Sequence, residues 1–244
     1  IIKKASYRNR RVSDVTAEIF RKEGALINDQ ERRFITLLVQ GTVRLSGRLD
    51  WELRQVFIGE FEDLKESLRI LLRLGTYQLL YMDSVPDYAA VTTTVQLAKK
   101  IHENLGGLTN ALLRTMINLE EKEHPDEHTP ILTLANYLSH PEWLLSKWIK
   151  DHTFPMAKAL AEWNNQKPLI WFRVNRLSYT PTKFKNYLKK HDIQFEQFKH
   201  IPEFFKVSKV QALIKSDIFQ EGDISIQDPS AGMVVKLVDP KKKE

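Results

Sequence analysis

The hydrophobic period of this sequence changes once, near Pro168, and that change most constrains the fold. From Val12 to about Glu120, apolar residues recur every three or four positions, as they do on one face of an α-helix. From Pro168 the period changes to alternation, and Leu169–Asn175, an apolar run that ends with Arg173 and Asn175 on either side of Val174, is typical of a strand. The sequence therefore predicts an α+β protein, in which an all-helical domain precedes a small mixed subdomain.

Start and stop signals divide the first part into helices. The longest apolar-rich segment, residues 62–82, is predicted to be the central helix of the core. The other predictions are a helix around Val12–Phe20, one capped by Asn28 or Asp29, a short one over 51–57 capped by Asp50, one that Ser84 and Pro86 open and that runs to Ile101, and one after a break at Gly106–Gly107.

The second part is predicted to have the order β-α-β-β-α-β, which is typical of ferredoxin-like or RRM-like folds. The expected elements are a strand at 169–175, a helix from Thr180 and Pro181 to Lys190, strands at 194–198 and 203–207, a helix opened by a capping box of Ser208 and Gln211, a strand at 223–226, and a helix capped by Asp228 before Pro229.

An acidic, proline-containing loop over 120–130 separates the two parts, and two short helices follow it in PEWLLSKWIKDH and PMAKALAEWNNQ. We expect a helical domain over 1–130, a helical connector over 131–166, an α/β subdomain over 167–240 and a basic tail over 241–244. His124 and His128 are four residues apart, a spacing used by metal sites, but Pro125 interrupts the helix that would align them, so no metal is expected.

The net charge of +6 is unevenly distributed along the chain. Residues 1–54 contain 12 Lys/Arg and 7 Asp/Glu, residues 55–165 contain 10 and 15, and residues 166–244 contain 15 and 9. Two basic ends around an acidic middle favour contact with one polyanion, although solvated helix faces explain the same numbers. The absence of cysteine and of long apolar runs predicts no disulfide, no membrane contact and a cytoplasmic location.

Arginine is the residue expected at bidentate phosphate contacts, and two groups of residues qualify as an RNA-binding set. The alternative for the first group, near the N-terminus, is that its arginines form ordinary surface ion pairs. The alternative for the second group, in the α/β subdomain, is a structural role, with Asn175 ending the strand in a turn. The candidates are Arg8, Arg10, Arg11, Arg32, Arg33, Arg44 and Arg48 near the N-terminus, and Arg173, Asn175, Arg176, Lys183 and Lys185 in the α/β subdomain.

Several segments resemble known families. DQERRFITLLVQGTVR, RLDWEL, PDYAAVTTTVQLAKK and GGLTNALLRTMI are similar to the NusB fold, an all-helical RNA-binding domain, with a departure at Gln40, where an aromatic residue is usual. SHPEWLLSKW, the RVN triplet at 173–175 and the QDPS segment at 227–230 resemble the Sun/Fmu (RsmB-type) family of 16S rRNA cytosine-5 methyltransferases.

This resemblance implies a function for the chain and for a domain beyond it. The family pattern continues into a strand and a cysteine-containing loop that receives S-adenosylmethionine, so we expect this chain to be the front half of such an enzyme. Without a cysteine nucleophile, the chain itself is expected to bind no cofactor and to catalyse nothing, but to bind small-subunit ribosomal RNA. Gln227, Asp228 and Ser230 are expected to pack against the missing C-terminal methyltransferase domain and to shape the edge of its pocket.

Two other functions remain open at this point. The chain could be a stand-alone NusB-like RNA-binding or transcription antitermination factor that owns its α/β tail. It could also be a protein-interaction scaffold on which the basic ends are incidental.

Overall fold

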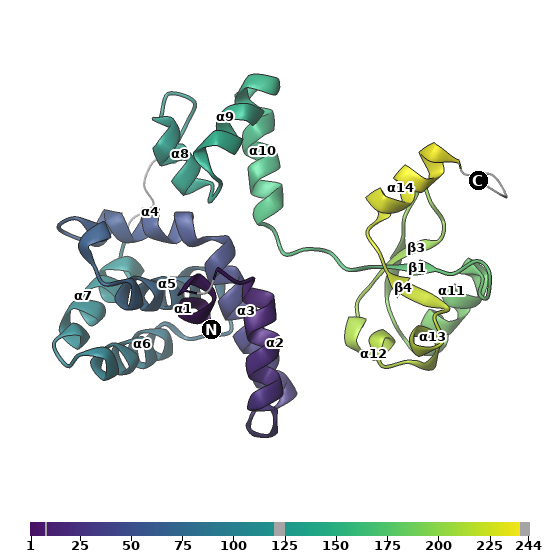
Figure 1. Cartoon of the computed structure of the whole chain (residues 1–244), viewed down its shortest axis with the longest axis horizontal. Helices are drawn as coiled ribbons and strands as arrows, with labels where there is room; N and C mark the ends of the chain where they lie inside the picture. Colours follow the sequence, from purple (N-terminus) through teal and green to yellow (C-terminus); the bar gives the residue numbers. More distant parts are fainter. Residues whose placement is uncertain (8, 120–124, 240–244) are drawn as a thin grey trace. The chain divides into compact units, whose positions relative to one another are not determined.

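The computed structural model describes residues 1–7, 9–119 and 125–239, and the chain divides into two compact units, 1–166 and 167–244 (Figure 1). Arg8, residues 120–124 with His124, and the tail 240–244 lie outside the described residues. The first unit is helical and the second is mixed α/β, as the change of period predicts.

The helical unit is built from α-helices and two short 3₁₀ segments. In chain order these are α1 (Ile2–Tyr7), α2 (Val12–Lys22), η1 (Gly24–Leu26), α3 (Asp29–Arg44), α4 (Ser46–Val56), η2 (Phe61–Asp63), α5 (Glu66–Tyr81), α6 (Asp87–Ile101), α7 (Leu105–Ile117), α8 (Ile131–Tyr137), α9 (Glu142–Asp151) and α10 (Phe154–Asn165).

Helix α5 is the centre of this unit, as the sequence predicts. It packs against α1, α3, α4, α6 and α7, and it buries both a leucine-rich face and Tyr77. The close approach of α3 depends on Gly41, because a Cβ atom there would lie 2.0 Å from the Tyr77 hydroxyl. A second cluster joins α8, α9 and α10, where Leu134, Leu145 and Ala161 are buried.

The α/β unit contains a four-stranded antiparallel sheet of order β2-β3-β1-β4. Its elements are β1 (Trp171–Val174), α11 (Pro181–Lys190), β2 (Phe195–Gln197), β3 (Phe204–Val207), α12 (Val210–Ile214), α13 (Asp217–Gln220), β4 (Ile224–Ile226) and α14 (Pro229–Val238). This is the predicted ferredoxin-like order, with α13 added between α12 and β4.

Helices cover both faces of this sheet. On one face, Phe172, Val174 and Phe205 pack with Phe184 and Leu188 of α11. On the other face, α14 lies against the sheet so closely that a Cβ atom on Gly232 would be 2.5 Å from the ring of Phe204 (Figure 1). The sheet therefore lacks the fully open face from which many RRM-like domains contact RNA.

Four predicted helix boundaries are wrong. The central helix begins at Glu66 rather than at residue 62, because residues 61–63 form the separate 3₁₀ segment η2. Asp50 does not cap a helix but lies inside α4, where it pairs with Arg73 of α5. Gly106 and Gly107 do not break the chain, because they occupy the first turn of α7. Ser208 caps nothing: its backbone N–H donates to the Gln194 carbonyl, so it continues the sheet and α12 begins at Val210. The sequence analysis also missed α1 and α8.

Candidate nucleic-acid interface

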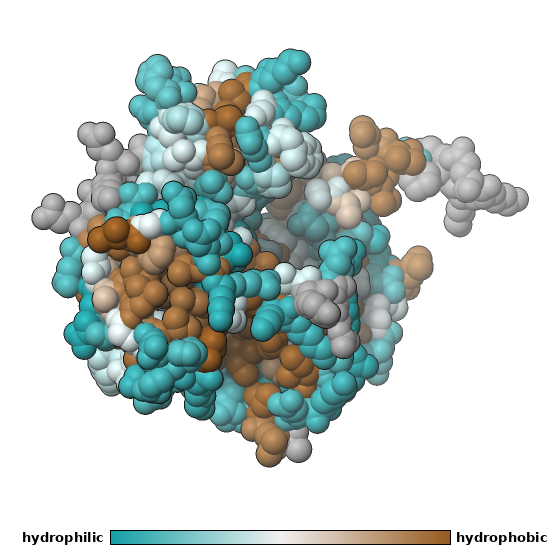
Figure 2. All heavy atoms as spheres, turned by 60° about the vertical axis from the view of Figure 1, so that its left-hand side comes forward, coloured by the Kyte–Doolittle hydropathy of each residue, from teal (hydrophilic) through white to brown (hydrophobic). Residues whose placement is uncertain are grey.

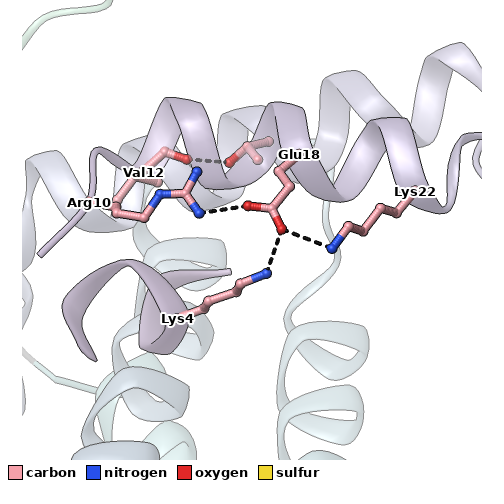
Figure 3. Close-up of polar contacts among 6 residues, drawn as sticks. Lys4, Arg10, Val12, Glu18 and Lys22 are labelled. Atoms are coloured by element: carbon pink, nitrogen blue, oxygen red, sulfur yellow. Dashed lines mark hydrogen bonds and ion pairs between the residues drawn. The ribbon is translucent and has the colours of Figure 1, made fainter. Parts of the chain in front are cut away.

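Three cations surround one carboxylate where α1 and α2 meet (Figure 3). Lys4 Nζ lies 2.9 Å and Lys22 Nζ 3.1 Å from Glu18 Oε1, and Arg10 Nη1 lies 2.6 Å from Oε2. Hydrogen bonds from Lys4, Arg10 and Lys22, in that order, hold the pKa of the Glu18 carboxyl far below its usual range. We refer to these four residues as the Glu18 cluster.

The Glu18 cluster has an excess of positive charge. One carboxylate neutralises one of its three cations, so the cluster keeps a net charge of about +2 near the exposed Arg11. The side chains of Lys4 and Arg10 are about one-third exposed, and that of Lys22 is 69% exposed. A fixed group of accessible cations is the arrangement that attracts phosphate.

Arg32 and Arg48, which the sequence analysis grouped with the RNA-binding candidates, contact the protein itself. Arg32 donates from Nε to the Ile27 carbonyl at 3.1 Å and from Nη2 to the Gly24 carbonyl at 2.9 Å, which closes the turn between α2 and α3. Arg48 donates to Glu52 at 2.8 Å, and its guanidinium lies 3.9 Å from the ring centre of Tyr137.

The two remaining arginines of this group differ from each other. Arg44 is half-buried, and its Nη1 donates to the Gln166 carbonyl at 3.4 Å. Arg33 is exposed on α3, and no ion pair or hydrogen bond to its side chain is found among the described residues. Of the α3–α4 arginines, Arg33 therefore has the accessibility that a phosphate contact needs.

The candidate side chains on β1 are also used locally. Arg173 is exposed, and its Nη1 donates to Gln227 Oε1 at 3.2 Å across the sheet. Asn175 donates to the Gly222 carbonyl and accepts from the Leu177 backbone, so its amide fixes the turn that ends the strand. Arg176 donates to Glu203 at 3.0 Å but keeps a side chain that is 72% exposed.

The lysines of α11 are different, because their ammonium groups are not neutralised. Lys183 is exposed and Lys185 half-buried, and neither has an ion pair within the part of the chain that the structure describes. The backbone N–H of Lys183 donates to Thr180 Oγ1, which confirms the predicted cap at the start of this helix.

The QDPS segment leads into an unusual helix. Asp228 caps α14 by accepting from the Ser230 backbone N–H at 2.8 Å, as predicted. The helix turns Gly232 toward the sheet and leaves large apolar side chains in solvent: Met233, Val234, Val235, Leu237 and Val238 are 48–87% exposed. In Figure 2, this apolar helix is the brown surface at the upper right.

Two kinds of site are not found in the described part of the chain. No group of three or more His, Cys, Asp or Glu residues there could hold a metal ion. None of its helices combines the length and apolar character that crossing a lipid bilayer requires.

The sequence analysis missed Lys4 and Lys22. The i,i+4 spacing of Glu18 and Lys22 on one helix is a recognisable pairing signal. Lys4 reaches Glu18 only because α1 folds back against α2, which no local pattern in the sequence indicates.

Two family models match successive parts of the chain. Residues 2–118 match the NusB family, and residues 140–213 match the Methyltr_RsmF/B-like, ferredoxin-like domain. Residues 2–118 thus form a NusB domain, and the match to the RsmF/B-type ferredoxin-like domain begins at residue 140, within α8–α10 of the first unit, and continues into the second.

The chain aligns with part of longer curated proteins. The chain is 30% identical over 219 residues to the "Probable ribosomal RNA small subunit methyltransferase B" of Bacillus subtilis, covering 89% of this chain and 48% of that protein. It is 29% identical over 220 residues to the "Ribosomal RNA small subunit methyltransferase B" of Pectobacterium atrosepticum, covering 89% and 50%. The chain therefore spans about half the length of these curated relatives, and the resemblance to the RsmB-type family is confirmed over that half.

A solved structure supports the fold. The crystal structure of the protein designated PH0851 superposes with a TM-score of 0.61 at 18% identity, over 93% of this chain and 51% of that one. At this level of identity the similarity concerns the fold alone.

Proposed function

We propose that this chain is the RNA-recognition portion of an S-adenosylmethionine-dependent rRNA (cytosine-5) methyltransferase, in which it binds and orients small-subunit rRNA for a catalytic domain. The observation that carries this proposal is the alignment of 89% of the chain with half of proteins named ribosomal RNA small subunit methyltransferase B. A protein that acts on ribosomal RNA in this way would be located in the cytoplasm.

In this proposal, the helical unit contacts the RNA backbone. The Glu18 cluster, with Arg11 and Arg33, presents cations that the protein does not fully neutralise. Arg8 and Arg10 belong to the same segment of sequence. Arg44 adds charge nearby along α3, whereas Arg32 and Arg48 contribute by holding α3 and α4 in place. Phosphate contacts of this kind position an RNA without reading its sequence.

The α/β unit would connect RNA recognition to catalysis. Helix α14 exposes its apolar residues and would bury them against the methyltransferase domain that the longer relatives suggest. Gln227 precedes this helix and is oriented by Arg173, so it would lie at the edge of the pocket that receives the cytosine. Asp228 and Ser230 fix the start of α14 and hold that edge in position.

The chemistry belongs to the catalytic domain. Methylation at C5 of cytosine needs a thiolate that adds to C6, and this chain contains no cysteine. S-adenosylmethionine would supply the methyl group. A hollow of about 360 Å³ near α1 is lined by Arg10, Glu66 and Arg73, each of which already has a partner within the chain, so these charged groups are not free to hold that cofactor.

The names of the relatives favour this proposal over a stand-alone antitermination factor. Both proposals predict RNA binding, but only the first predicts that α14 and Gln227 matter to a reaction. In the protein joined to its catalytic domain, Gln227→Ala should lower single-turnover methylation by about a hundredfold, since a misplaced pocket edge costs that order of rate. Normal methylation by this variant would assign the segment to helix capping alone.

Direct binding tests the RNA-recognition role. The chain should bind single-stranded segments of small-subunit rRNA with an affinity that falls as salt rises, at a slope of about −0.7 in log–log form for each neutralised phosphate. The double variant Arg11→Ala/Arg33→Ala should flatten that slope by about 1.4. Lys100→Ala/Arg114→Ala removes the same charge from exposed positions on α6 and α7 and is the matched control. If the two pairs of substitutions weaken binding equally, RNA binding depends on the net charge of the chain and not on Arg11 and Arg33. If the chain binds no RNA at low salt, RNA recognition is refuted.

A further inference from the structure

The longest acid-free stretch of the chain runs through α11. Residues 163–191 contain seven Lys/Arg and no Asp or Glu. The lysines on α11 are Lys183, Lys185, Lys189 and Lys190, and none has an ion pair among the described residues. Charge on this side of the unit is therefore more concentrated than the average composition of the domain indicates.

Aromatic side chains alternate with this charge at helical spacing. Tyr179, Lys183, Tyr187 and His191 are four residues apart and form one row, which we call the α11 row. Lys183 Nζ lies 6.0 Å from the ring centre of Tyr179. The ring centres of Tyr187 and His191 lie 4.3 Å apart, and the two planes are tilted by 35°.

The α11 row is accessible but firmly supported. Lys183 and His191 are exposed, while Tyr179 and Tyr187 are partly buried because they also pack against the core of the unit. Rings held in this way lose little side-chain entropy when a nucleobase stacks on them. An exposed ring beside unpaired ammonium groups matches a nucleotide, which has a flat base and an anionic phosphate.

The opposite side of the unit suits RNA less well. There α14 covers Phe204, Arg173 donates to Gln227, and Lys206 is paired with Glu196 at 3.0 Å. The sheet face on which an RRM-like domain would stack bases is thus partly covered and partly neutralised. The rings of Trp171, Phe198 and His200 lie on this side as well, but the four lysines of α11, which have no ion pair among the described residues, lie on the side that α11 covers.

We propose that the α/β unit binds single-stranded RNA along the α11 row, with bases stacked on Tyr187 and His191 and phosphates held by Lys183 and Lys190. This proposal rests on the RNA-binding function proposed above and assigns a site to it. Duplex RNA is a poor ligand here, because its bases are already stacked on each other and cannot stack on protein rings.

The test separates stacking from charge. His191→Ala and Tyr187→Leu remove a ring, and leucine keeps apolar contact with the core. Each should weaken binding of a single-stranded rRNA segment about fivefold or more, with little change in the salt slope and little effect on duplex binding. Thermal melting of each variant checks that the unit stays folded.

The lysine arm uses a pair of variants with equal charge. Lys183→Ala/Lys190→Ala should weaken binding about 25-fold at 0.1 M monovalent salt and flatten the slope by about 1.4. Lys199→Ala/Lys206→Ala removes two charges from elsewhere in the same unit and should change affinity less than threefold.

Each alternative outcome is informative. Wild-type affinity in folded His191→Ala and Lys183→Ala/Lys190→Ala variants, with RNA still bound, would overturn the α11 row and leave RNA recognition by the chain standing. Equal losses in the two lysine pairs would overturn it as well, in favour of general charge. An unmodified chain that binds no RNA would remove both proposals together.

Discussion

Replacing Glu18 with glutamine should strengthen RNA binding, an unusual sign for a change inside a packed ion cluster. The carboxylate holds Lys4, Arg10 and Lys22 at 2.6–3.1 Å. Glutamine keeps the size of the side chain but removes the negative charge that competes with phosphate for these cations. If the cluster is an RNA contact, at least one further phosphate can then be neutralised.

The magnitude follows from counterion release. One additional phosphate contact steepens the log–log salt slope by about 0.7, which corresponds to about fivefold higher affinity at 0.1 M monovalent salt. Fluorescence anisotropy with a labelled single-stranded rRNA segment, repeated at several salt concentrations, measures both quantities. The gain should shrink as salt rises, because the added contact is electrostatic.

Glu62→Gln is the matched control. Glu62 follows α4, is paired with Arg54, and has a carboxyl whose pKa that arginine lowers, so this variant adds the same unit of charge elsewhere in the helical unit. Its affinity should change less than twofold. An equal gain from both variants, or no gain from Glu18→Gln in a folded protein, would refute the reasoning that makes the Glu18 cluster a phosphate contact.

Three further predictions follow from side chains already described. Acidification should detach α1 from α2, because the folded-state pKa of Glu18 lies far below its ordinary value of 4.5. The stabilisation that the Glu18 carboxylate provides is complete above about pH 4.5 and is lost as the pH falls below that value. Fluorescence followed during an acid titration should show this loss in the unmodified chain but not in Glu18→Gln. Arg32→Ala should lower the free energy of unfolding by about 2 kcal/mol, because two hydrogen bonds to carbonyl groups are lost, and should leave RNA affinity unchanged. Arg33→Ala should weaken RNA binding and leave the free energy of unfolding unchanged. Urea denaturation and RNA titration of both variants distinguish the two roles. Asp228→Ala should destabilise the α/β unit by about 1 kcal/mol through the lost cap, and Gln227→Ala by less than about 0.5 kcal/mol; equal losses in thermal melts would contradict the cap assignment.

Local patterns predicted the elements whose causes are local. Asn28 forms the capping box with Glu31 at the start of α3, one of the two caps considered there, and Thr180 with Pro181 opens α11 where expected. The pattern over 169–175 predicted a strand, and the structure buries Phe172 and Val174 there and leaves Arg173 exposed. For the two caps, the deciding contacts lie within a few residues of one another along the chain.

Other features depend on contacts between distant residues. Asp50 precedes an apolar run and so resembles a cap, but its partner is Arg73, which lies 23 residues further along and binds it through two 2.6 Å contacts. The guanidinium of Arg48 lies over the ring of Tyr137, which belongs to a different helix. Helices α8 and α13 contain only seven and four residues, too few for a hydrophobic period to be detected.

The same distinction explains why charge counts located the basic ends but not the binding residues. Residues 1–54 have five more cations than anions, and the sequence alone assigns that surplus equally to every arginine. The fold distributes it unequally: Glu52 and backbone carbonyl groups engage Arg48 and Arg32, whereas a single carboxylate, Glu18, is shared by three cations. Because an ion pair already formed must be broken or shared before its cation can hold a phosphate, RNA affinity should follow the unshared charge at α1–α2 and α11 rather than the total number of arginines.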